Sequence, residues 1–195
     1  MEDKIESLLV KIKQLENELR AEIQKKERQF YYKIIREKVR FERDIKRNHK
    51  LLVKKIRLYF HEAPWSTILT APVIWSCLIP TVFMDLMITM YQALCFPVYG
   101  IPKVRRRDYI VLDRHYLSYL NGIEKLNCLY CGYFNGLVAY AQEVGARTEQ
   151  YWCPIKHARK VKFLHNRYPK FFEYGDGEKY REKIEEVRRS FKDIE

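Results

Sequence analysis

Four residues in the second half of the chain have the types and the spacing of a metal site. Cys128 and Cys131 are separated by two residues, which lets both sulfur atoms face one ion, and Gly132 lets the backbone turn so that amide groups point at the sulfur atoms. Cys153 and His157 lie four positions apart, as on one helical face or in one turn. Thiolate and imidazole groups are ligands that zinc prefers. The spacing therefore predicts a Cys₃His site made of Cys128, Cys131, Cys153 and His157.

The ligand set leaves the identity of the metal open. A closed Cys₃His set is typical of structural zinc, but the same donors could hold an iron–sulfur cluster. The CxxC could also be a dithiol redox pair, and His115 or His165 could take the fourth ligand place. The five cysteines are an odd number and no secretory signal precedes them, so we expect reduced, cytosolic thiols. We expect zinc as the cofactor, with an iron–sulfur cluster as the alternative.

No common enzyme signature accompanies these cysteines. The sequence has no glycine-rich phosphate loop, no nucleophile elbow and no HExxH motif. We therefore expect a non-enzymatic protein and assign no catalytic residue. If the protein is an enzyme, an oxidoreductase is the class that fits the cysteines.

Aromatic and basic residues alternate around the predicted metal site. Such a mixture can stack nucleic-acid bases and bind phosphate, and it can equally be the small core of a metal domain with a solvated basic rim. The net charge of +12 requires an anionic partner or strong solvation. Nucleic-acid binding is therefore kept as an alternative. The residues concerned are Tyr130, Tyr133, Phe134, Tyr151, Trp152, Lys156, Arg159 and Lys160.

A long apolar segment suggests a different anionic partner. Residues 58–102 contain no lysine or arginine, although these two types make up 37 of the 195 residues. Asp85 is the only charged residue between Ile68 and Tyr99. Because basic residues crowd both flanks of this segment, anionic membrane lipid is a better partner than nucleic acid. The flanking residues are Arg47, Lys50, Lys54, Lys55 and Arg57 on one side, and Lys103, Arg105, Arg106 and Arg107 on the other.

Prolines divide the apolar segment. A bilayer core of about 30 Å needs about 20 helical residues, and the stretch from Ile68 to Tyr99 is longer than that. Pro80 lies near its middle, and Lys and Arg mark the cytosolic side of a membrane. The pattern predicts a membrane-inserted hairpin over residues 64–102 that bends near Pro80, with a buried hairpin in a soluble core as the alternative. Asp85 would either have a function in the membrane or pair with a basic flank.

The first 63 residues contain neither glycine nor proline, and residues 3–60 are predicted to form one long helix or two helices end to end. Apolar residues between positions 5 and 19 alternate by three and four, as in the seam of a coiled coil. They predict self-association into a homo-oligomer through residues 5–19, or packing against the same chain. Residues 33–57 are strongly basic and are expected to touch anionic headgroups. The seam is Ile5, Leu8, Ile12, Leu15 and Leu19, and two rows with 11-residue spacing follow it: Phe30, Phe41 and Leu52, and Ile34, Ile45 and Ile56.

The expected fold is mostly α and has four parts. A long basic, coiled-coil-like helix occupies residues 1–63, and the membrane-inserted hairpin occupies residues 64–102. The Cys/His metal-binding domain covers residues 103–175, with a helix from Phe134 to Thr148. A C-terminal amphipathic helix follows in residues 176–195, where Tyr180, Ile184, Val187 and Phe191 share one face.

Four short motifs lie between His61 and about Lys160: Thr70–Ile74 (TAPVI), Cys95–Pro102 (CFPVYGIP), Cys128–Tyr133 (CLYCGY) and Tyr151–His157 (YWCPIKH). With these motifs, about half of the chain resembles an uncharacterised family of bacterial membrane-associated proteins. The resemblance implies a bacterial, membrane-associated context, and brings no activity or ligand with it. Together with the basic flanks, it leads us to expect the cytoplasmic side of the bacterial inner membrane.

The sequence as a whole predicts a membrane-associated module with a structural zinc site that acts in protein interaction or scaffolding. A membrane-bound electron-transfer protein with a Cys₃His iron–sulfur centre is the first alternative. A nucleic-acid-binding protein at the membrane is the second.

Overall fold

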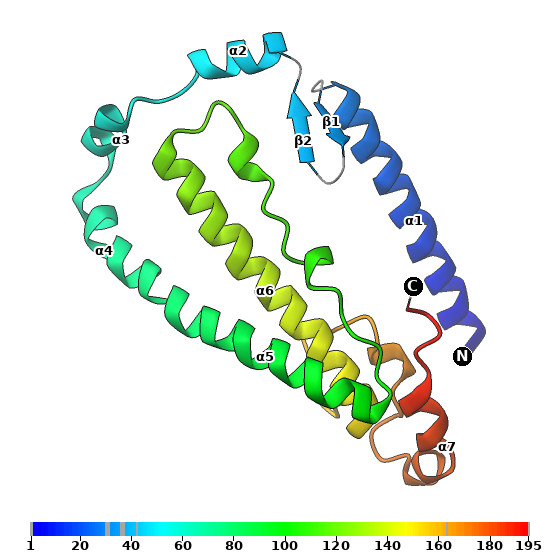
Figure 1. Ribbon diagram of the computed structural model, residues 1–195. Helices are drawn as coiled ribbons and strands as arrows, with labels where there is room; N and C mark the ends of the chain where they lie inside the picture. The colour runs from blue at the N-terminus through cyan, green and yellow to red at the C-terminus, as the bar shows by residue number, and fades with distance from the viewer. Residues whose placement is uncertain (1, 30–31, 36–37, 42, 163, 195) are drawn as a thin grey trace. The chain divides into compact units, whose positions relative to one another are not determined.

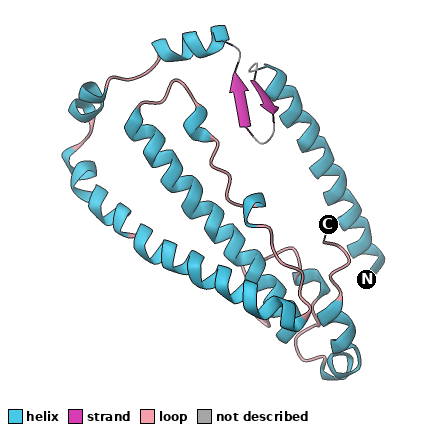
Figure 2. Ribbon diagram, in the orientation of Figure 1, coloured by secondary structure: helices cyan, strands magenta, loops and turns pink. Residues whose placement is uncertain are grey.

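The computed structural model describes residues 2–29, 32–35, 38–41, 43–162 and 164–194. The chain is mostly helical, which confirms the expected fold class (Figure 2). It divides into two compact units. The first unit consists of Met1–Glu62 with Asp113–Leu126, and the second of Ala63–Leu112 with Asn127–Glu195.

The first unit begins with α1 (Glu2–Gln29), which is followed by a two-stranded antiparallel hairpin of β1 (Tyr32–Ile35) and β2 (Lys38–Phe41). Two short helices complete it, α2 (Arg43–Leu51) and α3 (Ile56–Glu62). The expectation of continuous helix over residues 3–60 is therefore wrong beyond Gln29. Both strand sequences, YKII and KVRF, carry the β-branched and aromatic types that favour a pleated strand.

The apolar seam of α1 faces outward. Ile12, Leu15 and Leu19 are 53%, 63% and 62% exposed. The side chains of Ile5 and Leu8, and those of Phe30, Ile34, Phe41 and Ile45 in the expected 11-residue rows, lie outside the described part of the chain.

In the second unit, the apolar segment forms two helices, α4 (Trp65–Ser76) and α5 (Leu78–Tyr99), joined at Cys77 with helical backbone angles. The expected hairpin bend near Pro80 is not seen. Pro80 lies in the first turn of α5, where its missing N–H would have bonded to the carbonyl of Ser76, the last residue of α4. The proline therefore interrupts one hydrogen bond without reversing the chain. Together the two helices form one helical segment, Trp65–Tyr99, that is long and apolar enough to cross a membrane.

The helix α5 ends in a tight left-handed cap. Gly100 has φ 66°, a conformation that glycine adopts without steric cost. The N–H groups of Gly100 and Ile101 donate to the carbonyl oxygens of Pro97 (3.4 Å) and Phe96 (2.9 Å), as in a Schellman motif. This cap turns the chain so that the segment from Ile101 to Leu112 can run back beside the next long helix, α6 (Gly122–Trp152).

A capping box at Asn121 fixes the first residue of α6. The Glu124 N–H donates to Asn121 Oδ1 (2.9 Å), and the Asn121 N–H donates to Glu124 Oε2 (2.8 Å). The expected helix from Phe134 to Thr148 therefore begins 12 residues earlier, at Gly122. From there α6 runs in the same direction as α4 and α5, as Figure 1 shows. The hydroxyl of Tyr130 donates to Ile74 O (2.8 Å) at one end, and the rings of Tyr151 and Tyr99 stack at the other.

The core of the second unit lies where α5 and α6 meet the C-terminal segment. It consists of Phe96, Ile101, Val104, Leu137, Tyr140, Val144 and Phe191. The buried Gln92 amide crosses this core: its Nε2 donates to Val104 O (3.2 Å) and Tyr140 Oη (3.0 Å), and its Oε1 accepts from the Val104 N–H (2.6 Å). Gln92 thus fixes the returning segment to both helices.

Short elements complete the second unit. The segment after α6 pairs Ile155 with Phe172 and contains a 3₁₀ turn, Tyr168–Lys170. The last helix, α7 (Gly177–Arg189), starts at Asp176, whose carboxylate accepts a hydrogen bond from the Lys179 N–H (3.1 Å). Two further 3₁₀ turns lie in the chain before α6, Arg106–Asp108 and Arg114–Tyr116.

Candidate functional site

The structure places the four predicted metal ligands at the two ends of a helix. Cys128 and Cys131 lie within α6, and Cys153 follows its last residue, with the Cys153 N–H still bonded to Glu149 O (2.8 Å). At 1.5 Å per residue, the helix separates Cys128 from Cys153 by about 37 Å. Among the described residues there is no group of three or more His, Cys, Asp or Glu side chains that could hold a metal ion. The structure therefore does not bring the Cys₃His set together.

The three histidines considered as ligands have separate surroundings. His157 is exposed and stacks beside Tyr168, whose ring centre lies 6.3 Å away. His165 Nδ1 accepts a hydrogen bond from the Arg167 N–H (3.2 Å), so its Nε2 donates to Glu149 Oε2 (3.0 Å). His115 packs against Tyr116 in the first unit. The role that the structure supports for His165 is to hold the backbone of Arg167.

Both carboxylate oxygens of Asp85, the charged residue within the apolar segment, accept hydrogen bonds. Its carboxylate accepts two hydrogen bonds from the guanidinium of Arg106, one of them from Nε at 3.1 Å. The hydroxyls of Tyr133 (2.8 Å) and Thr89 (3.3 Å) donate to the same group. Of the two roles considered for Asp85, the structure shows the pairing with a basic flank.

The side of α4 and α5 opposite Asp85 exposes large apolar side chains. Leu69, Ile79 and Val98 are 75%, 76% and 79% exposed, although they span nearly the whole segment. The exposed positions from Leu69 to Val98 include no charged residue. A soluble monomer rarely exposes so long an apolar surface. The further large side chains on this face are Val73, Ile74, Val82, Phe83, Leu86, Met87, Met90 and Leu94, and together with Leu69, Ile79 and Val98 we call them the apolar face.

A second cluster of charges lies deep in the second unit, around Glu143 on α6. Its Oε1 accepts hydrogen bonds from Nε of Arg147 (2.7 Å) and from Nε (3.2 Å) and Nη2 (3.0 Å) of Arg167. Both arginine side chains are only 6% exposed. Arg147 Nη1 also donates to Pro102 O (2.7 Å), and Arg167 Nη1 donates to Gln150 Oε1 (3.0 Å). Because every one of these groups is held by a hydrogen bond, the two guanidinium groups are fixed in place.

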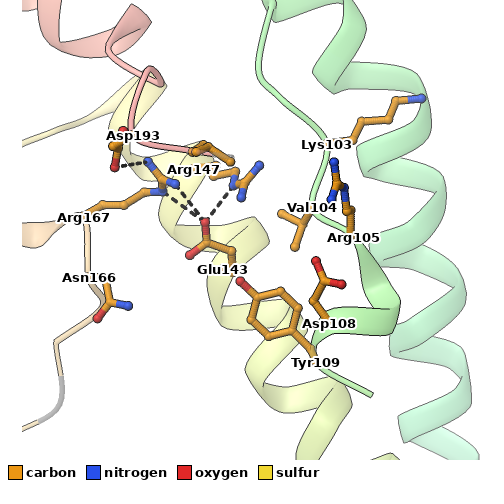
Figure 3. Close-up of a pocket in the computed structure, with 11 residues that line it drawn as sticks. Lys103, Val104, Arg105, Asp108, Tyr109, Glu143, Arg147, Asn166, Arg167 and Asp193 are labelled. Carbon is orange, nitrogen blue, oxygen red and sulfur yellow. Dashed lines mark hydrogen bonds and ion pairs between the residues drawn. The ribbon is translucent and has the colours of Figure 1, made fainter. Parts of the chain in front are cut away.

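These arginines line a cavity of about 320 Å³, shown in Figure 3. One wall is the segment after α5, with Lys103, Val104, Arg105, Asp108 and Tyr109, and the other is α6 with the C-terminal segments, with Glu143, Arg147, Asn166, Arg167, Asp193 and Ile194. We call it the arginine pocket. The cationic side chains of its lining outnumber the acidic ones.

Close backbone contact places Tyr109 in this pocket. A Cβ atom on Gly136 would lie 2.8 Å from Ile110 Cα and from Tyr109 O, so the segment lies against α6 only because residue 136 is glycine. Burial and the neighbouring Glu143 carboxylate raise the pKa of the Tyr109 phenol above its usual value of 10.0. The phenol therefore stays neutral at physiological pH.

The C-terminal segment closes the pocket with a carboxylate. Lys170 Nζ lies 2.6 Å from Asp193 Oδ1, and Arg167 Nη1 lies 3.9 Å from Oδ2. Burial alone would raise the pKa of Asp193, but the hydrogen bond from Lys170 and the two positive charges hold it below the usual 3.8. Asp193 is therefore ionised at physiological pH.

Sequence reasoning missed this pocket. Its residues come from segments as far apart as Lys103 and Asp193, and no short motif links them. The periodicity of α6 carried one signal: Glu143 and Arg147 lie four positions apart, on the same side as Tyr140 and Val144 of the core. An ion pair placed on a core-facing stripe indicates a buried polar network.

Comparisons with known proteins do not assign the chain to a group: no protein-family model matches it, and no curated protein and no solved structure is significantly similar to it.

Proposed function

We propose that the protein is a membrane-attached module that lies along one leaflet, with the apolar face of α4 and α5 in the lipid. The observation that carries this proposal is the length of the apolar face, which continues without a charge from Leu69 to Val98. Transfer of each large apolar side chain from water contributes about 1.5–3 kcal/mol. Eleven such side chains give an attachment that does not depend on charge.

Two features favour an orientation in the plane of the membrane. The helical segment of 35 residues is about 52 Å long, which exceeds the bilayer core of about 30 Å. Its polar residues Asp85 and Gln92 both lie on the side covered by the rest of the second unit. In the plane of the membrane these two side chains face the protein, and the side that faces the lipid carries no charge.

The basic flanks support the same orientation. Lys103, Arg105, Arg106 and Arg107 directly follow the apolar segment, and Lys54, Lys55 and Arg57 precede it. In the plane of a leaflet, both flanks reach anionic headgroups, each residue contributing about 1 kcal/mol. The bacterial inner membrane, on its cytoplasmic side, is the location that these flanks fit under the positive-inside rule.

No metal ion has a role in the proposed function. The two halves of the predicted Cys₃His set lie at opposite ends of α6, so an ion held by one pair is out of reach of the other. Protein interaction is assigned instead to the exposed seam of α1, whose residues Ile12, Leu15 and Leu19 fit a second copy of the same helix.

Membrane fractionation followed by depth measurement tests the proposal. After expression, membranes are washed with high salt and with carbonate, and the protein should stay in the pellet until detergent is added. For depth, the native tryptophans Trp65, Trp75 and Trp152 are replaced by phenylalanine. Single tryptophans are then placed at Leu69, Phe83 and Leu94, and quenched by lipids brominated at different acyl positions.

In-plane attachment predicts the same shallow depth for the three tryptophans, although they span 25 positions of the sequence. A membrane-spanning helix predicts a position near the bilayer centre for the tryptophan at Phe83 and shallower positions for those at Leu69 and Leu94, and this result contradicts the in-plane orientation. Release of the protein by salt alone contradicts lipid attachment through the apolar face. A tryptophan at Val138, which is 47% exposed on α6, serves as the control for a position outside this face.

A further inference from the structure

We propose that the arginine pocket of the second unit binds the phosphate group of a small anion. The proposal goes beyond membrane attachment, since the pocket lies on the covered side of α5 and not on the apolar face. Its volume of about 320 Å³ is at the small end of the range for ligand sites, about 300–1,000 Å³. A phosphate group with a short substituent has this size.

The acidic side chains of the pocket all have partners of opposite charge, but two of its basic side chains do not. Its three carboxylates already have cationic partners: Glu143 has Arg147 and Arg167, Asp193 has Lys170, and Asp108 has Arg107 at 3.8 Å. In contrast, Lys103 and Arg105 pair with no acidic side chain in the described part of the chain. Two lining cations therefore remain for a charge that comes from outside.

Arg147 and Arg167, on the facing wall, are held in position by other residues before a ligand binds. Arg147 uses Nε for Glu143 and Nη1 for Pro102 O, and no described residue accepts a hydrogen bond from its Nη2. Arg167 is held by Glu143 and Gln150, and its guanidinium lies 5.4 Å from the centre of the Phe191 ring. A planar guanidinium fixed in this way matches the oxygen atoms of a phosphate without losing side-chain freedom on binding.

Figure 3 shows the two walls that carry these groups; the exposed Lys103 side chain extends away from Arg147 and Arg167, and Arg105 runs along its own segment. Lys103 and Arg105 come from the segment after α5, while Arg147 and Arg167 come from α6 and the segment after it. A phosphate between the two walls can accept hydrogen bonds from both when the exposed Lys103 and Arg105 side chains turn toward it, with the neutral Tyr109 phenol as a further donor. Its charge offsets the repulsion between cations that the pocket brings together.

The phosphate could belong to a lipid headgroup or to a soluble compound, because both present the same oxygen atoms. The test therefore starts with inorganic phosphate and the full chain in a zwitterionic detergent. Phosphate is titrated against chloride at constant ionic strength, and binding is measured by calorimetry and by the thermal midpoint of unfolding. A second arm measures flotation with phosphatidylcholine vesicles that do or do not contain phosphatidic acid.

Two variants and their two controls make the test specific. K103A/R105A removes the two unpaired cations, both exposed, and should weaken phosphate binding about tenfold or more. Its matched control, R159A/K160A, removes two exposed cations outside the pocket and should leave the affinity unchanged. D108N removes an exposed carboxylate from the pocket and should strengthen binding, with E182Q as the control for the loss of a negative charge elsewhere.

The outcomes separate as follows. Saturable phosphate binding that K103A/R105A weakens and D108N strengthens supports the site. If phosphatidic acid then increases flotation of the wild type but not of K103A/R105A, and excess inorganic phosphate at constant ionic strength removes that increase, the source is a lipid headgroup. Flotation that phosphatidic acid does not change identifies a soluble phosphate compound. No saturable phosphate binding, or equal losses in K103A/R105A and R159A/K160A, overturns the proposal. The phosphate titration in detergent does not depend on membrane attachment, which the salt wash tests separately.

Discussion

The carboxylate of Asp85 on α5 and the guanidinium of Arg106, 21 residues further along the chain, form a two-bonded ion pair. The Asp85 side chain is 14% exposed, whereas that of Arg106 is 46% exposed. The pair thus connects a carboxylate on the covered side of an apolar helix to a base that reaches solvent. It fixes the returning segment at the point where that segment passes α6, since the Tyr133 hydroxyl also donates to Asp85.

Loss of Arg106 should destabilise the second unit. R106A leaves the Asp85 carboxylate with the Tyr133 and Thr89 hydroxyls but without its charged partner, and hydrogen bonds to charged groups contribute about 1.5–3 kcal/mol. The free energy of unfolding in detergent, measured with denaturant, checks this value. D85N/R106A should be more stable than R106A alone, because the uncompensated charge is then removed as well.

The matched control is R107A. Arg107 has an exposed side chain and lies 3.8 Å from the exposed Asp108, so its removal should change stability by less than about 0.5 kcal/mol. Equal effects of R106A and R107A would show that the Asp85 pair does not support the fold.

Two glycines on α6 should respond to alanine with opposite signs. In G136A the new methyl group meets backbone atoms of Tyr109 and Ile110 at 2.8 Å, which cannot move without displacing the whole segment. We expect a loss of about 1–3 kcal/mol. In G145A the methyl group has no neighbour within 4 Å, and alanine favours the helix by about 0.5–1 kcal/mol. Thermal unfolding of both variants measures the difference, and a stabilised G136A would contradict the close contact.

The sequence predicts the helical class, and one overlooked signal explains why the four predicted metal ligands lie apart in the structure. Asn121 and Glu124 have the spacing of a capping box, which marks the start of a helix at Gly122. From that start, the CxxC lies within a helix and 22 positions before Cys153. A CxxC inside a continuous helix cannot turn its backbone toward an ion as a metal knuckle does. Local capping chemistry was therefore more informative than the spacing of the cysteines.

Other differences between sequence and structure have local causes. Of the residues in the 11-residue rows, Ile34 lies in β1 and Phe41 in β2, and the cross-strand pairing of these strands, such as Tyr32 with Phe41, is not visible in a helical spacing. The network of Glu143, Arg147 and Arg167 depends on contacts between distant segments, which periodicity does not encode. The apolar segment, in contrast, needs only composition and length to be recognised.

The cysteine hypothesis has a direct test in metal content. With α6 intact, Cys128 and Cys153 cannot share an ion, so we expect well below one zinc or iron atom per chain in protein purified without oxygen. The exposed thiols of Cys131 and Cys153 should then react with maleimide at rates that added zinc does not change. One metal ion per chain, lost in both C128S and C153S, would show instead that α6 breaks when the metal binds. The C95S variant, outside the predicted ligand set, is the control.

The carboxylate of Asp193 should make stability depend on acid pH. Its pKa is lower in the folded protein than the usual 3.8, so its contribution is present at pH values above that of the unfolded chain and is lost as the pH falls through the folded pKa. The wild type should therefore be more stable than D193N at pH 6, and the difference should begin to shrink near pH 4 and disappear only below the folded pKa. Thermal midpoints of both proteins across this range give the measurement. A difference that is constant with pH would contradict the ion pair with Lys170.

The exposed seam of α1 predicts association of two copies of the chain. In a parallel pair of α1 helices, Leu15 and Leu19 of one copy pack against the same residues of the other. Lys11 and Glu16 then occupy the flanking positions where opposite charges of the two copies meet. Three heptads are a marginal length, so the association should be weak and should depend on protein concentration.

Sedimentation equilibrium in density-matched detergent measures this association. L15A/L19A should sediment as a monomer at concentrations where the wild type forms dimers, because the substitution removes the largest side chains of the seam. K13A/N17A, on the outer side of the same helix, keeps the seam and should remain dimeric. If all three proteins behave alike, α1 does not join two copies. Sedimentation of the wild type at a range of salt concentrations separates the apolar contribution of the seam from the ionic one, since only the contact between Lys11 and Glu16 is screened by salt.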